Sequence, residues 1–341
     1  MILVRVDADP QIGTGHMMRC LALASFLSQE KQDVLFVTST LEASQAITKA
    51  GYECILLPQD IRGSFNAELF QLSLIVERKS PRMMIVDSYA YDRDELKEID
   101  SLVPVAFFDD MQLDNLEVDT IINGNITADV LAYDAKYGET AMNLLVGTKY
   151  CVLRKEFECV QGHKDFSKLQ NILISTGGAD PFDASLVITK ELLSYTFLDK
   201  VHINVMVGSM NPNYTKLKDL AKQNQRLNVL RGITEVSKIM EKADLAIAAG
   251  GTTLNELCVC GVPTICYALA DNQLNCIDIF AKEKAAISVG HINSEEFISS
   301  LYSATRNLAG NQDLRRALST EARKLYDGKG AYRIAKDIIE R

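Results

Sequence analysis

Short apolar runs alternate with longer amphipathic segments along the chain, which is the pattern of β-strand–α-helix units on a parallel sheet. The first apolar runs predict strands at 2–6, 33–38, 53–57, 83–87, 104–108, 119–123 and 143–146. A helix is predicted over 16–30, because Met17, Leu21 and Ala24 recur on one face at a helical period.

A second series of the same kind begins near residue 171. Its apolar runs predict strands near 171–175, 202–207, 227–230, 244–248, 263–267 and 286–289. Between the two series, the segment 151–169 loses periodicity and gains charge, so we interpret it as the link between domains. A chain of 341 residues exceeds the size at which one core stops growing. We therefore expect two doubly wound, Rossmann-like α/β domains facing a cleft, 1–155 and 165–341, with the last helix able to pack back on the first domain.

Composition narrows the class of protein. The chain is 47% hydrophobic and 24% charged, which is typical of a globular protein. Its net charge of −9, without any run of Lys or Arg, argues against nucleic acid and anionic membranes as partners. No signal-like segment precedes the first strand, and the eight cysteines include no Cys-x-x-Cys pair. Most cysteines lie in apolar runs, so we expect buried free thiols and a cytoplasmic protein, rather than a metal or disulfide site.

Two glycines and a histidine follow the first predicted strand directly. Open α/β sheets bind ligands outside the carboxyl ends of their strands, and Gly13 and Gly15 let the chain turn tightly while a ligand comes close. His16 then lies in the first turn of a helix, where the positive end of the dipole favours a neutral imidazole that can act as a base. A capping or packing role is the alternative for His16. The remaining histidines are interpreted as structural or surface residues: His163, His202 and His291.

Three polar segments follow strands of the second series: 175–181, 250–256 and 270–273. Gly250 and Gly251 open a predicted helix, which presents unpaired backbone N–H groups to an anion such as a diphosphate. Thr252 and Thr253 can cap this helix and donate hydroxyls, and Glu256 can accept from a ribose diol one turn further on. The alternative is an ordinary helix cap with a tight turn. No Gly-Lys-Ser/Thr follows, so this is not a Walker loop.

Carboxylates and a tyrosine follow two strands of the first series. Asp109 and Asp110 come after 104–108, where they could bind a divalent metal or share a proton. Because no histidine neighbours them, we favour hydrogen bonds to backbone or substrate and expect no metal. Tyr89, after 83–87, either presents its ring and hydroxyl to a sugar or simply lies at the edge of the cleft.

Together these motifs resemble the PseG/SpsG family, whose members are UDP-2,4-diacetamido-2,4,6-trideoxy-β-L-altropyranose hydrolases of pseudaminic acid biosynthesis and related spore-coat polysaccharide proteins. The resemblance begins with residues 5–7 and 12–21. It continues in order over nearly the whole chain: 86–89, 108–110, 121–123, 149–154, 177–181, 243–256, 272–273 and 327–330.

The resemblance implies a GT-B architecture like that of the transferase MurG, with UDP held by the carboxy-terminal domain. The loop at 250–253 would take the diphosphate, Glu256 the ribose, and backbone near Ile233 the uracil. His16 would activate water at the anomeric carbon, with inversion and without metal or cofactor. The predicted substrate contacts also include Gly13, Gly15, Arg19, Tyr89, Gly178, Asn255, Asn272 and Gln273. Supporting roles are predicted for Asp7, Asp109 and Asp110.

Three functions remain open on the sequence alone. Hydrolysis of a UDP-linked amino-sugar is the first. Glycosyl transfer to an acceptor is the second, because the same UDP-binding half serves both reactions. The third is a nucleotide-sugar-binding protein without catalysis, which would need neither His16 nor a site for water.

Overall fold

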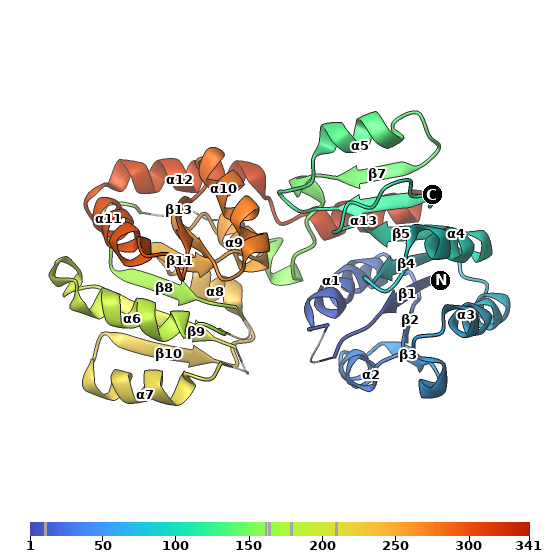
Figure 1. The fold of residues 1–341 in the computed structure, drawn as a ribbon, viewed down its shortest axis with the longest axis horizontal. Coiled ribbons are helices and arrows are strands. Elements are labelled where there is room, and N and C mark those ends of the chain that lie inside the picture. The colour runs from blue at the N-terminus through green and yellow to red at the C-terminus, as the bar shows by residue number, and fades with distance from the viewer. Residues whose placement is uncertain (10–11, 161, 163–164, 178–179, 209–210) are drawn as a thin grey trace. The chain divides into compact units, whose positions relative to one another are not determined.

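The computed structural model of the chain describes residues 1–341 except 10–11, 161, 163–164, 178–179 and 209–210. The chain divides into two units, of which the first comprises Met1–Lys155 with Lys329–Arg341 and the second Glu156–Gly328. Each unit contains its own parallel β-sheet covered by helices (Figure 1). The predicted class, two α/β domains with parallel sheets, is therefore confirmed.

The first unit has a seven-stranded sheet in the order β3-β2-β1-β4-β5-β6-β7. Its strands are β1 (Ile2–Val6), β2 (Val34–Thr38), β3 (Glu53–Leu56), β4 (Met83–Asp87), β5 (Val105–Phe108), β6 (Thr120–Asn123) and β7 (Asn143–Val146). Its helices are α1 (Gly15–Gln29), α2 (Leu41–Lys49), α3 (Phe65–Lys79), α4 (Arg93–Leu102), α5 (Val130–Tyr137) and α13 (Gly330–Glu340). Each predicted strand of this series is present, to within one residue at each end.

Both faces of the first sheet are buried, which explains why its strands are nearly continuous apolar runs. One face packs on α1 and on α13, the last helix of the chain. The other face packs on α3 and α4, through residues such as Leu72 and Leu96. Because side chains alternate along a strand, Val4 lies on the α1 side and Leu3 on the other.

The second unit has a six-stranded sheet in the order β10-β9-β8-β11-β12-β13. Its strands are β8 (Asn171–Ser175), β9 (His202–Val207), β10 (Leu227–Arg231), β11 (Leu245–Ala249), β12 (Thr264–Ala268) and β13 (Ile287–His291). Its helices are α6 (Ala184–Ser194), α7 (Tyr214–Gln223), α8 (Val236–Glu241), α9 (Thr252–Val259), α10 (Leu274–Lys282), α11 (Phe297–Gly310) and α12 (Gln312–Leu325).

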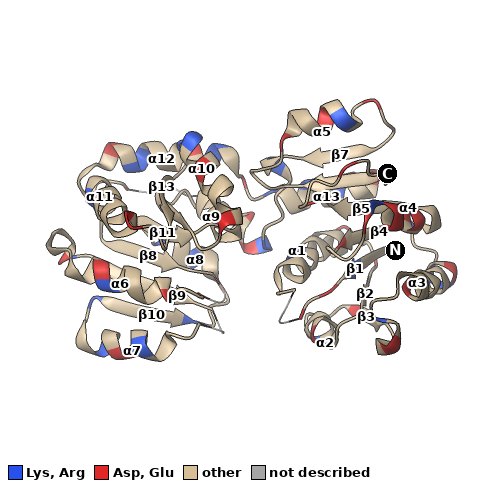
Figure 2. Ribbon diagram, in the orientation of Figure 1, with Lys and Arg blue, Asp and Glu red and all other residues tan. Residues whose placement is uncertain are grey.

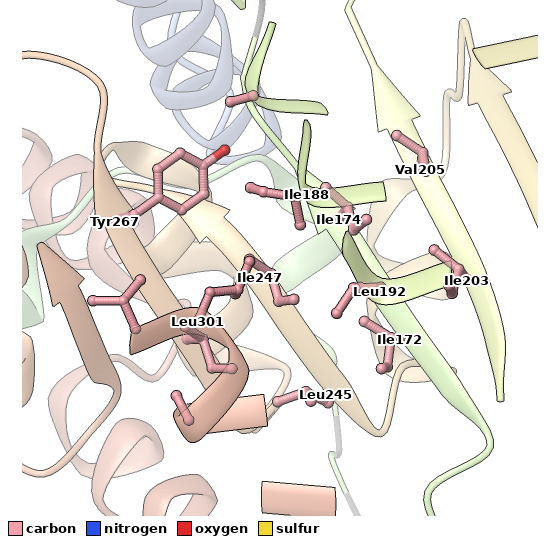
Figure 3. Close-up of a cluster of buried hydrophobic side chains, with 14 of the residues drawn as sticks. Ile172, Ile174, Ile188, Leu192, Ile203, Val205, Leu245, Ile247, Tyr267 and Leu301 are labelled. Carbon is pink, nitrogen blue, oxygen red and sulfur yellow. The ribbon is translucent and has the colours of Figure 1, made fainter. Parts of the chain in front are cut away.

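Figure 3 shows part of the core of this unit, where side chains of neighbouring strands pack with those of α6 and α11. The residues labelled there come from four strands of the sheet and two helices: Ile172, Ile174, Ile188, Leu192, Ile203, Val205, Leu245, Ile247, Tyr267 and Leu301. A core of this kind holds the strand ends, and the loops that follow them, in a fixed register.

Charged residues lie chiefly on helices and loops in both units (Figure 2). Arg5 in β1 and Asp87 in β4 are charged residues inside the first sheet, and each is only 1% exposed. Buried charges require partners, so these positions point to organised polar groups at the sheet. Within the described residues, no helix has the length and apolar character needed to cross a membrane.

Candidate active site

The register of the first sheet brings a carboxylate to His16. Val6 at the end of β1 pairs with Asp87 at the end of β4, and the loop after β1 leads into α1. His16, in the first turn of α1, places its Nδ1 atom 2.5 Å from Asp87 Oδ1. The His16 side chain is 11% exposed and that of Asp87 is fully buried. The carboxylate of this pair is therefore enclosed by the protein, whereas the imidazole remains partly accessible from outside.

Arg19, one turn further along α1, joins this pair to a second carboxylate. It donates to both oxygens of Asp87, from Nε at 2.6 Å and from Nη2 at 2.7 Å. It also donates to Asp110, from Nη2 at 2.6 Å and Nη1 at 3.1 Å. Its guanidinium lies over the ring of Phe108, 4.4 Å from the centroid. Two-point pairing of this kind fixes both carboxylates in position.

The charge of Asp87 determines which nitrogen of His16 carries a proton. Burial opposes ionisation of Asp87, but the charge and hydrogen bonds of Arg19, with those of His16, outweigh it and lower the pKa of Asp87 to about 2. At neutral pH the carboxylate is therefore only an acceptor, so Nδ1 of His16 must be the donor. In the neutral ring Nε2 then carries the lone pair, as a general base requires.

Tyr89 forms the edge of the same site. Its ring meets that of His16 edge-on with centroids 4.5 Å apart, and its hydroxyl donates to Asp110 at 3.2 Å. Burial, and then the charge of Asp110, raise the pKa of Tyr89 to about 12, so the phenol keeps its proton at neutral pH. Asn125, after β6, donates to Asp110 at 2.8 Å. The site thus combines a base with hydroxyl and amide groups suited to a polar ligand.

The other predicted supporting carboxylates have different partners. Asp109 is buried and accepts from the Tyr133 hydroxyl at 2.6 Å and from a backbone N–H at 2.9 Å. Asp7 accepts from the Ser39 N–H at 2.7 Å and pairs with Arg5 at 2.8 Å. These contacts hold the loop after β5 and the ends of β1 and β2, so both residues support the strands that carry the site.

The two glycines before His16 differ in what the backbone demands of them. Gly13 has a φ of +82°, in the left-handed region where a side chain is strained. Gly15 has an ordinary φ, and a Cβ on either residue would meet no heavy atom within 4 Å. The structure therefore requires glycine for conformation at 13, whereas open space beside both glycines leaves room for a ligand.

His16, Asp87 and Asp110 present ligand atoms that all lie within 4.8 Å of one another, a spacing compatible with a metal ion. Arg19 donates to both carboxylates, so the protein itself supplies a cation at this place. The expectation of a reaction without metal stays a prediction, and the assay described below includes a chelator for this reason.

A cavity of about 730 Å³ lies beyond the carboxyl ends of β8, β11, β12 and β13 in the second unit. Of the residues predicted to bind UDP, it is lined by Gly250, Gly251, Thr252, Thr253 and Gln273. Gly178, also predicted, lies outside the described residues. Four loops from separate strands thus meet at one edge of this sheet, as is usual for ligand sites of open α/β folds.

The helix that opens on this cavity begins differently from the prediction. The expectation that Thr252 and Thr253 cap it is wrong, because α9 starts at Thr252 and Gly251 is its N-cap residue, without a side-chain hydrogen bond. A Cβ on Gly250 would lie 3.0 Å from Gln273 Cβ and 3.1 Å from a methyl group of Ile277, so a side chain at this position would crowd its neighbours. Uncapped N–H groups at a helix start are suited to an anion.

The remaining predicted contacts are not among the described residues that line the cavity. Asn255 is buried in α9, and Glu256 is half-buried one position further. Asn272 is exposed in the short 3₁₀ turn Asp271–Gln273, and Ile233 follows β10. Their assignments stay predictions.

Sequence reasoning missed three residues of these two sites. Asp87 and Asn125 were not identified as site residues, and His291 was interpreted as structural or surface, yet it lines the cavity. Each of the three lies at or just after the carboxyl end of a strand, which was the available signal. The strand order, which brings these residues to their partners, could not be predicted from the sequence.

Two parallel α/β units, with polar sites at the carboxyl edges of their sheets, define a protein of the GT-B class. The family model described as the glycosyltransferase family 28 C-terminal domain matches residues 159–338, more than half of the chain. The chain belongs to this family.

Three relatives extend the comparison. The chain is 26% identical over 305 residues to the protein MJ1062 of Methanocaldococcus jannaschii, covering 86% of this chain but only 60% of that longer protein. It is 24% identical to the spore coat polysaccharide biosynthesis protein SpsG of Bacillus subtilis, covering 96% and 94% of the two chains. It is 26% identical to the UDP-2,4-diacetamido-2,4,6-trideoxy-β-L-altropyranose hydrolase of Campylobacter jejuni, covering 78% and 91%. The predicted resemblance to the PseG/SpsG family is confirmed.

Solved structures confirm the predicted GT-B architecture. MurG of Acinetobacter baumannii matches with a TM-score of 0.70 at 15% identity, covering 100% of this chain and 99% of that one. A structure of MnaA from S. aureus with UDP matches with a TM-score of 0.64 at 13% identity, covering 99% and 95%.

Proposed function

We propose that this protein hydrolyses a UDP-linked 2,4-diacetamido-2,4,6-trideoxy hexose to the free sugar and UDP, in the biosynthesis of a nonulosonate such as pseudaminic acid. The observation that carries the proposal is the His16–Asp87 pair, with Nδ1 held at 2.5 Å by a carboxylate that Arg19 keeps ionised. The name of the Campylobacter jejuni relative supports the substrate, and the SpsG relative supports a place in polysaccharide or sugar biosynthesis.

In the proposed reaction His16 Nε2 removes a proton from water as the water oxygen bonds to the anomeric carbon. The bond between that carbon and the β-phosphate oxygen breaks, UDP leaves with the electron pair, and the configuration inverts. Asp87 stabilises the imidazolium that forms, because its negative charge faces the opposite ring nitrogen. General base catalysis of this kind contributes about 10²–10⁴ in rate.

The second unit would hold the nucleotide. The N–H groups at the start of α9 and the hydroxyls of Thr252 and Thr253 suit the diphosphate, and they stabilise the charge that develops on the leaving group. Glu256 would accept from the ribose, and backbone near Ile233 would receive the uracil. The MnaA structure supports UDP as the ligand, because a protein of the same fold was solved there with UDP.

The sugar and the attacking water would lie beside the first unit. Tyr89 presents a protonated hydroxyl and an exposed ring, 55% accessible, next to His16. Open space beside Gly13 and Gly15 suits a close approach of the sugar to the start of α1. All eight cysteines are free thiols, which supports our assignment of the reaction to the reducing cytoplasm.

Glycosyl transfer is the second candidate, because the family match is to a glycosyltransferase domain and MurG shares the fold. The two functions differ in whether turnover needs an acceptor. We would incubate the protein with a panel of UDP-2,4-diacetamido-hexoses in EDTA, without acceptor, and measure UDP and free sugar. Hydrolysis predicts both products from one member of the panel. Release only after an acceptor is added would favour transfer, and binding without turnover in either assay would favour a binding protein.

A further inference from the structure

His291 ends β13 and lines the cavity of the second unit, a position for which the sequence suggested no role in binding. Among the described residues that line the cavity, it is the one whose side chain can carry a positive charge. Neither lysine nor arginine occurs in that described lining, although a nucleoside diphosphate brings at least two negative charges. A side-chain donor at the end of β13 would therefore be a significant part of its binding.

Two contacts fix the imidazole of His291. The backbone N–H of Asn293 donates to Nδ1 at 3.1 Å, so the lone pair of Nδ1 is in use. The ring also packs edge-on against Phe182, with centroids 6.1 Å apart at 72°. A neutral ring whose Nδ1 accepts must carry its hydrogen on Nε2. The ring is thus prepared to donate one hydrogen bond from Nε2 without a change of tautomer.

The acidic residues of the lining do not provide this donor. Asp180 is fully buried, and its carboxylate accepts from the N–H and hydroxyl of Ser185 and from the Asn211 amide. Asp271 is exposed at the start of the 3₁₀ turn. The carboxylate of Asp180 is therefore satisfied within the protein. The donors that the described lining offers are backbone N–H groups, hydroxyls, the side-chain amide of Gln273 and the imidazole of His291.

We propose that His291 donates a hydrogen bond from Nε2 to a phosphate oxygen of a nucleoside diphosphate bound in this cavity. The inference rests on the proposed function for the identity of the ligand. It adds a specific phosphate contact from β13 to the backbone site at the start of α9. The histidine keeps its proton throughout, and the bond strengthens as charge accumulates on the departing phosphate.

A matched pair of substitutions separates this role from a structural one. His291→Asn retains an oxygen near the Nδ1 position, which can accept from Asn293, but it removes the donor at Nε2. His291→Gln places an amide nitrogen near the Nε2 position and gives up the acceptor. A residue that only stabilises the turn should tolerate Asn better than Gln, whereas a phosphate ligand should show the reverse order.

Calorimetry would measure the binding of UDP and of uridine to the full chain and both variants at pH 8. We expect His291→Asn to weaken UDP about tenfold, a typical loss for a hydrogen bond to a charged group, and to leave uridine unchanged. His291→Gln should bind UDP within about threefold of the wild type. Equal UDP affinity in His291→Asn, or a parallel loss for UDP and uridine, would overturn the inference.

Histidine ¹⁵N NMR of the wild type provides a test that needs no variant to fold. UDP should shift the Nε2 resonance of His291, and uridine should leave it in place; no shift with saturating UDP would overturn the contact. Failure of the proposed function would look different. UDP would then bind with the expected His291 dependence, but UDP-sugar would release no product.

Discussion

The imidazole of His16 and the carboxylate of Asp87 are joined at 2.5 Å, although they lie 71 positions apart in the chain. Neighbouring strands β1 and β4 bring them together, and Arg19 donates to both oxygens of the carboxylate. This relationship explains how a histidine at the start of a helix is kept in the tautomer that can accept a proton from water.

Asp87→Asn tests that relationship. The amide can present its N–H to His16 and so favour the tautomer with a proton on Nε2, which removes the base, and it leaves Arg19 with one carboxylate. We expect kcat to fall by about 10²–10⁴ with UDP affinity little changed. Steady-state kinetics and calorimetry would check this. Asp109→Asn is the control, because that buried carboxylate contacts Tyr133 rather than His16; equal losses in both variants would contradict a specific role for Asp87.

His16 itself should be essential for turnover but not for nucleotide binding. His16→Ala and His16→Asn are each expected to lower kcat by about two to four orders of magnitude, the usual contribution of a general base. UDP affinity should stay the same, because the nucleotide is assigned to the second unit. His202→Asn, at an exposed position of β9, should behave as the wild type. Nearly normal turnover in His16→Ala would remove it from the mechanism.

The low pKa of Asp87 has a consequence for stability in acid. Because its folded-state pKa of about 2 lies below the usual aspartate value of 3.8, ionisation of Asp87 stabilises the fold above pH 4. This stabilisation is lost as the pH falls towards 2, and the shift corresponds to roughly 2 kcal/mol. Urea unfolding at pH 6 and at pH 2.5 should show a wild-type advantage over Asp87→Asn that shrinks in acid. An advantage independent of pH would contradict the ion pair.

Neighbouring glycines at the start of α9 should respond differently to alanine. Gly250→Ala places a Cβ 3.0 Å from Gln273 Cβ, so we expect a loss of stability of about 1–3 kcal/mol by overpacking. Gly251→Ala meets no heavy atom within 4 Å and its backbone is extended, so the melting temperature should hardly change. If a diphosphate lies against this backbone, Gly251→Ala should nevertheless weaken UDP. Unchanged UDP affinity in that variant would place the phosphates elsewhere.

The strands could be predicted because parallel strands buried on both faces are short, uninterrupted apolar runs. His16 could be found for a related reason, since it follows directly on the first of these runs. Its partners could not, because the position of Asp87 beside β1 depends on a strand order that no local pattern encodes. The position of His291 in the cavity lining could not be predicted for the same reason, because it depends on which loops lie beside the end of β13. The prediction at Thr252 was also wrong. Its hydroxyl was expected to cap α9, but Gly251 is the N-cap residue and Thr252 is already the first residue of the helix.

The origin of the oxygen in the product tests the central claim most directly. The protein should be incubated with its UDP-sugar in ¹⁸O-labelled water with EDTA and without acceptor, and both products analysed early by mass spectrometry and NMR. If His16 directs water to the anomeric carbon, the label appears on the anomeric oxygen of a sugar of inverted configuration, and UDP is unlabelled. Label in the UDP would mean attack at phosphorus and would contradict the account.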